Sequence, residues 1–259
     1  MGLIPSVLRR PDRDRDGAMT LVEHLEELRR RLFICLGAIA VGSIVGWLLY
    51  NPLLRVMTNP FCDWVHTLPP SQQPPAGCRL VATGPIDPVM VKIKVVAVLG
   101  LFVALPVVLY QLWAFIVPGL TTRERRMAIP FVASSLVLFA LGAGVAYLTL
   151  PKALGFLLGF GGPTITPFLT ANAFLSFVLL VGLAFGATFE FPIVLIFLMI
   201  AGVLSSEKLR SWRRMAILVI AVAAAVITPS ADPWSMLAMM LPMLLFYELA
   251  IIVGRLLKH

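Results

Sequence analysis

The sequence predicts an all-α protein that crosses a membrane six times, and its composition, hydropathy pattern and charge distribution each support this. Of the 259 residues, 59% are hydrophobic and 13% are charged, and the mean hydropathy is +0.95. A soluble protein of this length cannot bury so much apolar surface in one core. The apolar residues fall into six runs separated by charged or polar segments. The predicted spans cover about residues 32–50, 89–117, 127–150, 172–204, 215–228 and 234–254.

The positions of the basic residues predict the orientation of the chain. Lys and Arg gather in the cytoplasmic loops of membrane proteins. Here 16 of the 21 Lys and Arg residues lie in the N-terminal segment, the loops after the second and fourth spans, and the C-terminal tail. Both termini are therefore expected in the cytoplasm. The same rule accounts for the net charge of +8, so that charge does not indicate nucleic-acid binding.

The N-terminal region divides into two parts. Residues 1–18 are expected to be a disordered cytoplasmic extension without a cleavable signal pattern, and Met19 is a candidate for the true start. Thr20 and Glu23 then have capping-box spacing, which predicts a helix. We expect this helix to be an amphipathic lead-in along the membrane interface, with an apolar stripe formed by Leu21, Leu25, Leu28 and Leu32.

The first span and the outer segment after it contain glycines and cysteines. Gly42 and Gly46 have the GxxxG spacing that favours close helix packing inside the bundle, with self-association as the alternative. Residues 53–88 are polar and proline-rich and are expected to form a loop. Cys62 and Cys78 lie in that loop, and a disulfide between them would contribute about 3 kcal/mol in an oxidising compartment. Free thiols are the alternative.

The stretch YQLWAFIVPGLTTRERR, from Tyr110 to Arg126, ends the second span at a Pro-Gly pair and then becomes strongly charged. It places Glu124 among three arginines, and Tyr, Trp and Gln side chains favour the boundary between hydrocarbon and headgroups. We expect a structured cap at the cytoplasmic surface. An ordinary basic loop is the alternative interpretation.

The fourth and fifth apolar runs have unusual lengths, with an outer loop expected at residues 151–171 before them. The fourth run of roughly 33 residues gives a helix of about 50 Å, against about 30 Å of hydrocarbon. It must tilt or kink, and Pro192 predicts a kink. The fifth run is about 21 Å long by the same rise, so it is expected to thin the bilayer locally.

Acidic residues near the last three spans are candidate functional groups. Glu190 lies within the fourth run, where a charge costs at least about 2.5 kcal/mol, so it is expected to face the bundle interior, a water-filled hollow or a partner. A satisfied structural acid is the alternative. Thr228 and Asp232 belong to the outer turn before the last span, where Asp232 is a candidate cap for the sixth helix.

The sequence contains no pattern for covalent chemistry. Its three histidines are scattered, and it has no GxSxG, Walker lysine loop or HExxH motif. We therefore expect no enzyme activity, no metal and no cofactor.

Four stretches carry a resemblance to a known family. They are HLEELRRR at His24–Arg31, the Tyr110–Arg126 stretch, FEFP around Glu190, and TPSADP followed by LPMLLFYE near the C-terminus. In this order they resemble the TatC family, the multi-span receptor of the twin-arginine protein translocase, over nearly the whole chain from about residue 19 to 259. The departures are the N-terminal extension, the cysteine pair, and Met236 where the family often has a polar side chain.

The resemblance implies a fold, a function and site residues. The fold is a concave six-helix bundle, and the function is a signal-peptide receptor that exports folded proteins across the cytoplasmic membrane, driven by the proton-motive force. The substrate's signal peptide carries two consecutive arginines, which favour carboxylates in fork geometry. Matching motif positions imply Glu27 and Glu124 as the binding carboxylates, Arg29 and Arg125 as supporting residues, and Phe115 at the edge of the site.

The resemblance also implies partners. The apolar segment of the signal peptide would lie along the concave membrane face that contains Glu190. Glu190 and Thr228 are expected to form an intramembrane polar or partner site. Single-span TatA- and TatB-like proteins would pack against the fourth, fifth and sixth helices, and copies of the chain would assemble in a larger complex in the bilayer. The alternative function is a proton- or ion-coupled small-solute transporter, which predicts repeated halves that the sequence does not show.

Overall fold

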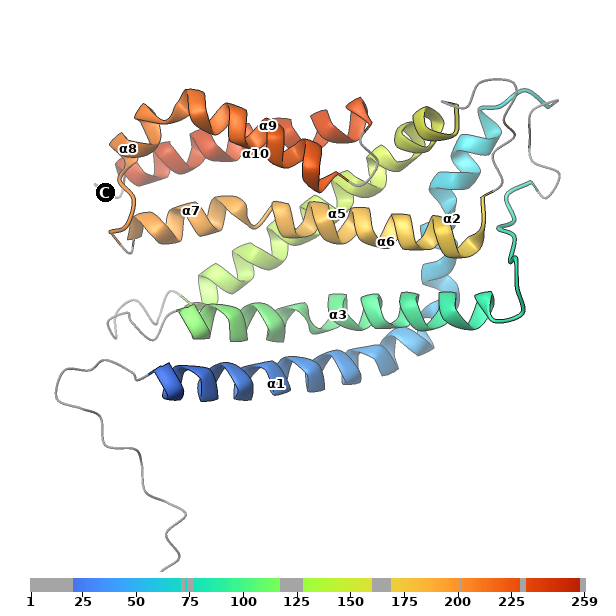
Figure 1. Ribbon diagram of the computed structural model, residues 1–259, viewed down its shortest axis with the longest axis horizontal. Coiled ribbons are helices and arrows are strands. Elements are labelled where there is room, and N and C mark those ends of the chain that lie inside the picture. The colour runs from blue at the N-terminus through green and yellow to red at the C-terminus, as the bar shows by residue number, and fades with distance from the viewer. Residues whose placement is uncertain are drawn as a thin grey trace, which may run out of the picture.

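The computed structural model describes residues 21–70, 73, 77–116, 128–159, 169–200, 202–228 and 232–256. Within these ranges the regular structure is helical, apart from one isolated bridge between Val81 and Thr170. Figure 1 shows an elongated bundle in which most helices lie along the long axis. The helices are α1 (Leu21–Leu48), α2 (Tyr50–His66), α3 (Asp87–Ile116), α5 (Ala128–Gly159), α6 (Ala171–Thr188), α7 (Phe191–Ile200), α8 (Ser206–Ser211), α9 (Arg213–Ile227) and α10 (Pro233–Leu256).

Five stretches are long and apolar enough to cross a membrane, as their lengths and compositions show: α1, α3, α5, the α6–α7 pair and α10. The remaining predicted span, the fifth along the chain, is α9, whose 15 residues extend about 22 Å. The start of α1, the end of α3, the start of α5 and the end of α10 lie at one end of the bundle, on the left in Figure 1. We call this predicted cytoplasmic side the inner end, and the opposite side the outer end.

The lead-in before the first span was expected to lie along the membrane interface, and the structure corrects this. Residues 21–31 are the first turns of α1, a single helix of 28 residues that continues into the span. The leucine stripe and the apolar run share one helical period, so no break separates them. The proposed cap residue Thr20 lies outside the described residues.

Two loops predicted at the outer end are partly helical. Residues 53–88 were expected to form a loop, but α2 occupies Tyr50–His66, with Leu54, Met57, Phe61 and Val65 packed in the main core. Their spacings of three, four and four residues place them on one face of a helix. The prediction of a loop at 151–171 was also wrong for its first residues. Helix α5 continues through Pro151 to Gly159 because Ala153 and Leu154 remain buried against the bundle.

The long fourth run breaks into two helices. Helix α6 ends at Thr188 and α7 begins at Phe191, so the break lies at Phe189–Glu190, ahead of Pro192. Proline lacks an amide hydrogen and fits the first turn of a helix, where that hydrogen would have no partner. The prediction of a kink is confirmed, and its position follows from this preference.

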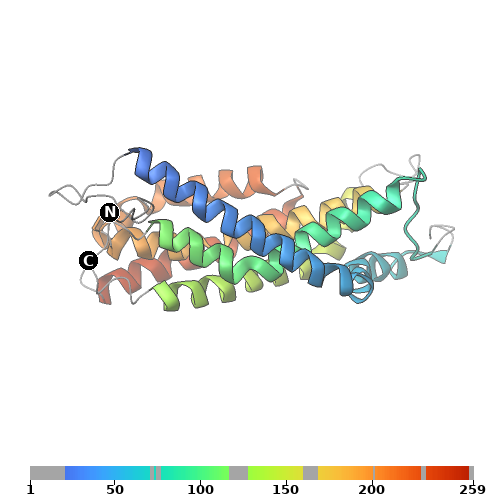
Figure 2. The same cartoon turned by 90° about the horizontal axis from the view of Figure 1, so that it is seen from below.

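Helices α1 and α3 approach each other closely through glycines, as both views of the bundle show (Figures 1 and 2). A Cβ at Gly42 would collide with the backbone of Gly100, and one at Gly46 would lie 3.1 Å from the carbonyl oxygen of Val96. The structure therefore favours packing inside the bundle as the role of this glycine pair. The close approach also fixes α1 beside the inner end of α3, where the candidate site lies.

Candidate functional site

A carboxylate at the inner end of α1 is held by an arginine one turn later. The Arg31 Nε–H donates to Glu27 Oε1 at 3.0 Å, and Arg31 Nη2 donates to the same oxygen. The third nitrogen, Arg31 Nη1, donates to the side-chain oxygen of Gln111 on α3, also at 3.0 Å. Glu27 Oε2 is buried and has no hydrogen-bond partner among the described residues. The network thus leaves one oxygen of the carboxylate without a donor.

Aromatic side chains surround this network. The His24 ring on α1 stacks on the Phe115 ring of α3, with centroids 4.5 Å apart and an interplanar angle of 18°. Phe115, predicted at the edge of the site, therefore joins the two helices that carry Glu27 and Gln111. Arg29 was expected to orient the acids or to contact the polar flank of the peptide. Its guanidinium lies over the Phe33 ring at 5.8 Å, on an exposed part of α1, and its role stays a prediction. In the structure the residue that contacts Glu27 is Arg31.

The other two predicted residues of this site are Glu124 and Arg125. They fall within 117–127, outside the described residues, so their roles stay predictions. The described half of the site lies where α3 ends and this segment begins.

A second polar group lies within the membrane-spanning part of the bundle. Ser135 on α5 is fully buried, with 0% of its surface exposed, and its hydroxyl accepts a hydrogen bond of 3.2 Å from the Trp113 indole nitrogen. The Glu190 carboxylate, at the α6–α7 break, is a polar neighbour of the same hydroxyl. Glu190 Oε1 is buried, with no hydrogen-bond partner in the described ranges. Glu190 therefore faces the bundle interior, which is one of the placements predicted from the free-energy cost of a charged side chain in lipid.

Thr228 and Asp232 lie at the outer ends of α9 and α10 and belong to neither polar group. Thr228 follows α9, is buried, and its hydroxyl contacts the Met239 sulfur at 3.8 Å. Asp232 Oδ1 accepts a hydrogen bond of 2.7 Å from the Ser235 amide, the bond made by an aspartate that caps a helix. No described contact links Thr228 to Glu190, with which it was grouped.

The cysteine pair is present as free thiols, so the disulfide is not formed in this structure. Cys62 Sγ lies 3.9 Å from the carbonyl oxygen of Cys78, and Cys78 Sγ lies 3.8 Å from His66 Nε2. Burial raises the pKa of the Cys62 thiol to about 11, with smaller contributions from Cys78 and Asp63. Within the described residues, no three His, Cys, Asp or Glu side chains are arranged to hold a metal ion.

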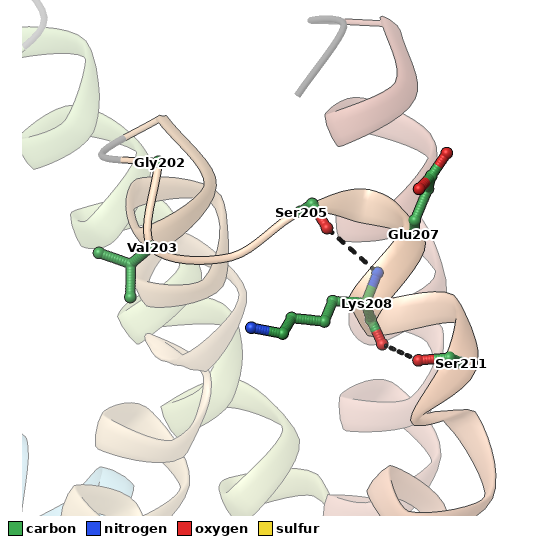
Figure 3. Close-up of a pocket in the computed structure, with 6 residues that line it drawn as sticks. All are labelled: Gly202, Val203, Ser205, Glu207, Lys208 and Ser211. Carbon is green, nitrogen blue, oxygen red and sulfur yellow. Dashed lines mark hydrogen bonds between the residues drawn. The ribbon is translucent and has the colours of Figure 1, made fainter.

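A hollow of about 420 Å³ lies between the end of α7 and α8 (Figure 3). Its polar groups stabilise the ends of α8. Ser205 Oγ accepts a hydrogen bond of 3.2 Å from the Lys208 amide, and Ser211 Oγ donates one of 2.8 Å to the Lys208 carbonyl. The Lys208 side chain extends toward α7, whereas Glu207 points away from it. The hollow therefore brings together no acid and base that would suggest a reaction.

Sequence reasoning missed four residues of the polar networks. Arg31 follows Glu27 by four positions, which is the spacing of a helical ion pair and was a usable signal. Gln111, Trp113 and Ser135 had no such signal, because their partners are on other helices. Only packing brings these groups together.

Comparison with known proteins decides the family. The sequence model described as "Sec-independent protein translocase protein (TatC)" matches residues 23–242. The chain belongs to the TatC family. The TatC protein of Frankia casuarinae is 45% identical over 97% of this chain and 70% of its own length. That of Aquifex aeolicus is 39% identical over 92% of this chain and 95% of its own.

A solved TatC structure shares the fold. A crystal structure of the twin-arginine translocase receptor TatC superposes with a TM-score of 0.71 at 38% identity, covering 92% of this chain and all of the other. A second structure, of the receptor in DDM, gives 0.70 over 90% of this chain. This chain is therefore a TatC-family subunit of the Sec-independent protein translocase, a multi-pass membrane protein with a transport role. The family match replaces the small-solute transporter alternative.

Proposed function

We propose that the inner-end site of this TatC-family subunit is the receptor for the arginine pair of a signal peptide. The observation that carries the proposal is the Glu27 carboxylate, which has one oxygen bound by Arg31 and the other buried without a donor from the part of the chain that the structure describes. A guanidinium supplies planar N–H groups that suit a carboxylate oxygen, and it is more weakly hydrated than an ammonium. Glu124 supplies the second carboxylate from the adjoining segment, and Arg125 supports it.

We extend the proposal to the membrane part of the bundle. The apolar segment of the signal peptide lies along the face that contains Glu190, and folded substrates cross the cytoplasmic membrane at the expense of the proton-motive force. TatA- and TatB-like single-span proteins pack against α6–α7, α9 and α10. Support comes from the outward apolar face of α9, with exposed Met215, Ile217, Leu218, Val219, Val222 and Val226. The subunit performs no covalent chemistry.

The experiment is binding of labelled peptides to the purified full-length protein in lipid nanodiscs. One peptide carries an Arg-Arg pair and its twin carries Lys-Lys. We expect tighter binding of the Arg-Arg peptide, and we expect Glu27→Gln and Glu124→Gln each to weaken it by about tenfold or more, since a hydrogen bond to a charged group contributes about 1.5–3 kcal/mol. Glu26→Gln is the matched control, because Glu26 is an exposed neighbour on the same helix. Equal binding of the two peptides by the parent protein would contradict the proposal.

A further inference from the structure

We infer that Arg31, anchored by Gln111, is a positioning residue that fixes the Glu27 carboxylate and reserves its second oxygen for the incoming guanidinium. The inference rests on the proposed function and deepens it, because it assigns the preference for arginine over lysine to a specific hydrogen-bond network. Neither residue is required to touch the peptide. Their effect is on the orientation of the group that does.

The hydrogen-bond geometry carries the first step. An arginine and a carboxylate usually pair fork to fork, with one N–H on each oxygen. Here Arg31 Nε and Nη2 both donate to Glu27 Oε1, and no described residue donates to Oε2. The pair therefore neutralises part of the Glu27 charge without using the whole carboxylate. One oxygen is left for a second donor.

The second step explains why the arrangement holds without a ligand. A buried polar atom that lacks a partner is unfavourable, so a free glutamate would rotate Oε2 toward water or toward Arg31. Arg31 Nη1 is bound to Gln111 at 3.0 Å, and Gln111 belongs to α3, 80 positions along the chain. This bond fixes the plane of the guanidinium against a second helix. The side chains of Glu27 and Arg31 are also only 22% and 21% exposed, which limits their rearrangement.

The third step concerns the choice between arginine and lysine. Arg31 already neutralises part of the Glu27 charge, and arginine and lysine each carry one positive charge. Coulomb attraction alone therefore distinguishes the two peptides poorly. A guanidinium presents its donors in one rigid plane, so its binding depends on where Oε2 points. An ammonium is a compact point charge with three rotatable donors and tolerates many carboxylate orientations. Loosening the Arg31 anchor should therefore weaken Arg-Arg binding much more than Lys-Lys binding.

A rival role for Arg31 predicts the opposite result. If Arg31 were a stand-in, meaning that it occupied the position of the peptide's arginine and had to leave Glu27 before the peptide bound, loosening its anchor would strengthen Arg-Arg binding. The unused Oε2 favours the positioning role, because a stand-in would be expected to occupy the full carboxylate. The sign of the affinity change separates the two roles.

The test measures the ratio of Arg-Arg to Lys-Lys peptide affinity in the full-length protein in nanodiscs. We expect Gln111→Leu to weaken the Arg-Arg peptide by about three- to tenfold, less than the loss of a direct charged hydrogen bond, and to change the Lys-Lys peptide less than about twofold. Gln111→Glu keeps an acceptor for Arg31 and should preserve the ratio. Arg31→Lys should lower the ratio as Gln111→Leu does. Arg30→Lys, at an exposed position of the same helix, should not change it.

Each outcome supports or overturns the inference. If the parent protein shows no Arg-Arg preference, the proposed function fails and this inference fails with it. If the parent shows the preference and Glu27→Gln abolishes it, but Gln111→Leu and Arg31→Lys keep the parent ratio, only the positioning role is wrong. Tighter Arg-Arg binding by Gln111→Leu would instead support the stand-in role. If the Gln111→Leu protein does not fold, the Arg31→Lys and Gln111→Glu variants decide between the two roles.

Discussion

At the residue scale, two acids among the described residues each have a polar partner on one side only. Glu27 has Arg31 on one oxygen, and Glu190 has Ser135 as its polar neighbour, while one oxygen of each is buried without a donor from the described residues. Buried polar groups in folded proteins are usually paired, so such exceptions indicate strain or function. The two unpaired carboxylate oxygens indicate two sites that can accept a further hydrogen bond.

The Ser135 hydroxyl connects Trp113 to Glu190, and its removal should be costly. We expect Ser135→Ala to lower the free energy of unfolding by about 1–3 kcal/mol, because two buried polar groups lose their partner. Thermal unfolding in nanodiscs measures this, with Ser134→Ala as the matched control at an exposed neighbouring serine. Equal melting temperatures for the two variants would show that the Trp113–Ser135–Glu190 network contributes little.

The raised pKa of Cys62 predicts slow alkylation. With a pKa of about 11, about one molecule in a thousand carries the thiolate at pH 8, whereas about one in four would at the ordinary thiol pKa of about 8.5. We expect maleimide labelling of Cys62 to accelerate as pH rises toward 11, in a protein that has Cys35 replaced by serine and keeps Cys78, with modification of the Cys62 peptide measured by mass spectrometry. The same protein unfolded in detergent is the control and should react at the ordinary rate. Rapid labelling of the folded protein at pH 8 would contradict the assignment.

The same shift has a consequence for stability. The folded state holds the Cys62 proton more tightly than the unfolded state does. Its contribution is therefore fully present below the ordinary thiol pKa of about 8.5. It is lost as pH rises from there through about 11.

At the element scale, the seam between α1 and α3 depends on the absence of side chains at a few positions. We expect Gly42→Ala to destabilise the protein by about 1–3 kcal/mol, because its Cβ meets the backbone of Gly100 and forces the helices apart. Because the seam fixes α1 beside Gln111, the variant should also weaken Arg-Arg peptide binding. Unfolding and peptide titrations measure the two effects.

A glycine on the same helix supplies the control for this seam. Gly37 has nothing within 4 Å of the position its Cβ would take. Gly37→Ala should therefore be neutral or stabilising by up to about 1 kcal/mol, because alanine favours the helix. If Gly37→Ala were as harmful as Gly42→Ala, helix packing could not be the cause.

At the scale of the whole molecule, the charge distribution predicts the side on which each loop lies. We expect a cysteine introduced at Gln73 to react with a membrane-impermeant maleimide in intact cells. A cysteine at Lys208 should react only after the membrane is opened. Both positions are exposed in the structure, so access to the reagent is set by the membrane. A background without the native cysteines is required, and labelling of both sites in intact cells would contradict the orientation.

The sequence by itself determined the fold class, the six apolar runs and the family resemblance. These depend on hydropathy and charge along the chain, which need no knowledge of contacts between helices. The kink near Pro192 and the isolated acid at Glu190 were visible for the same reason. The lengths of α2 and α5 were not, because the energy that extends each helix comes from burial against other helices.

Only the tertiary structure decided which side chains meet. The bond from Arg31 to Gln111 joins residues 80 positions apart, and it exists because glycine contacts bring α1 against α3. Ser135 reaches Trp113 and Glu190 because α5 packs between the helices that carry them. Sequence motifs singled out Glu27 and Glu190, since a charge near or inside a membrane is conspicuous, and their functional roles stay predictions. The neutral partners that orient them are ordinary residues until packing places them beside a carboxylate.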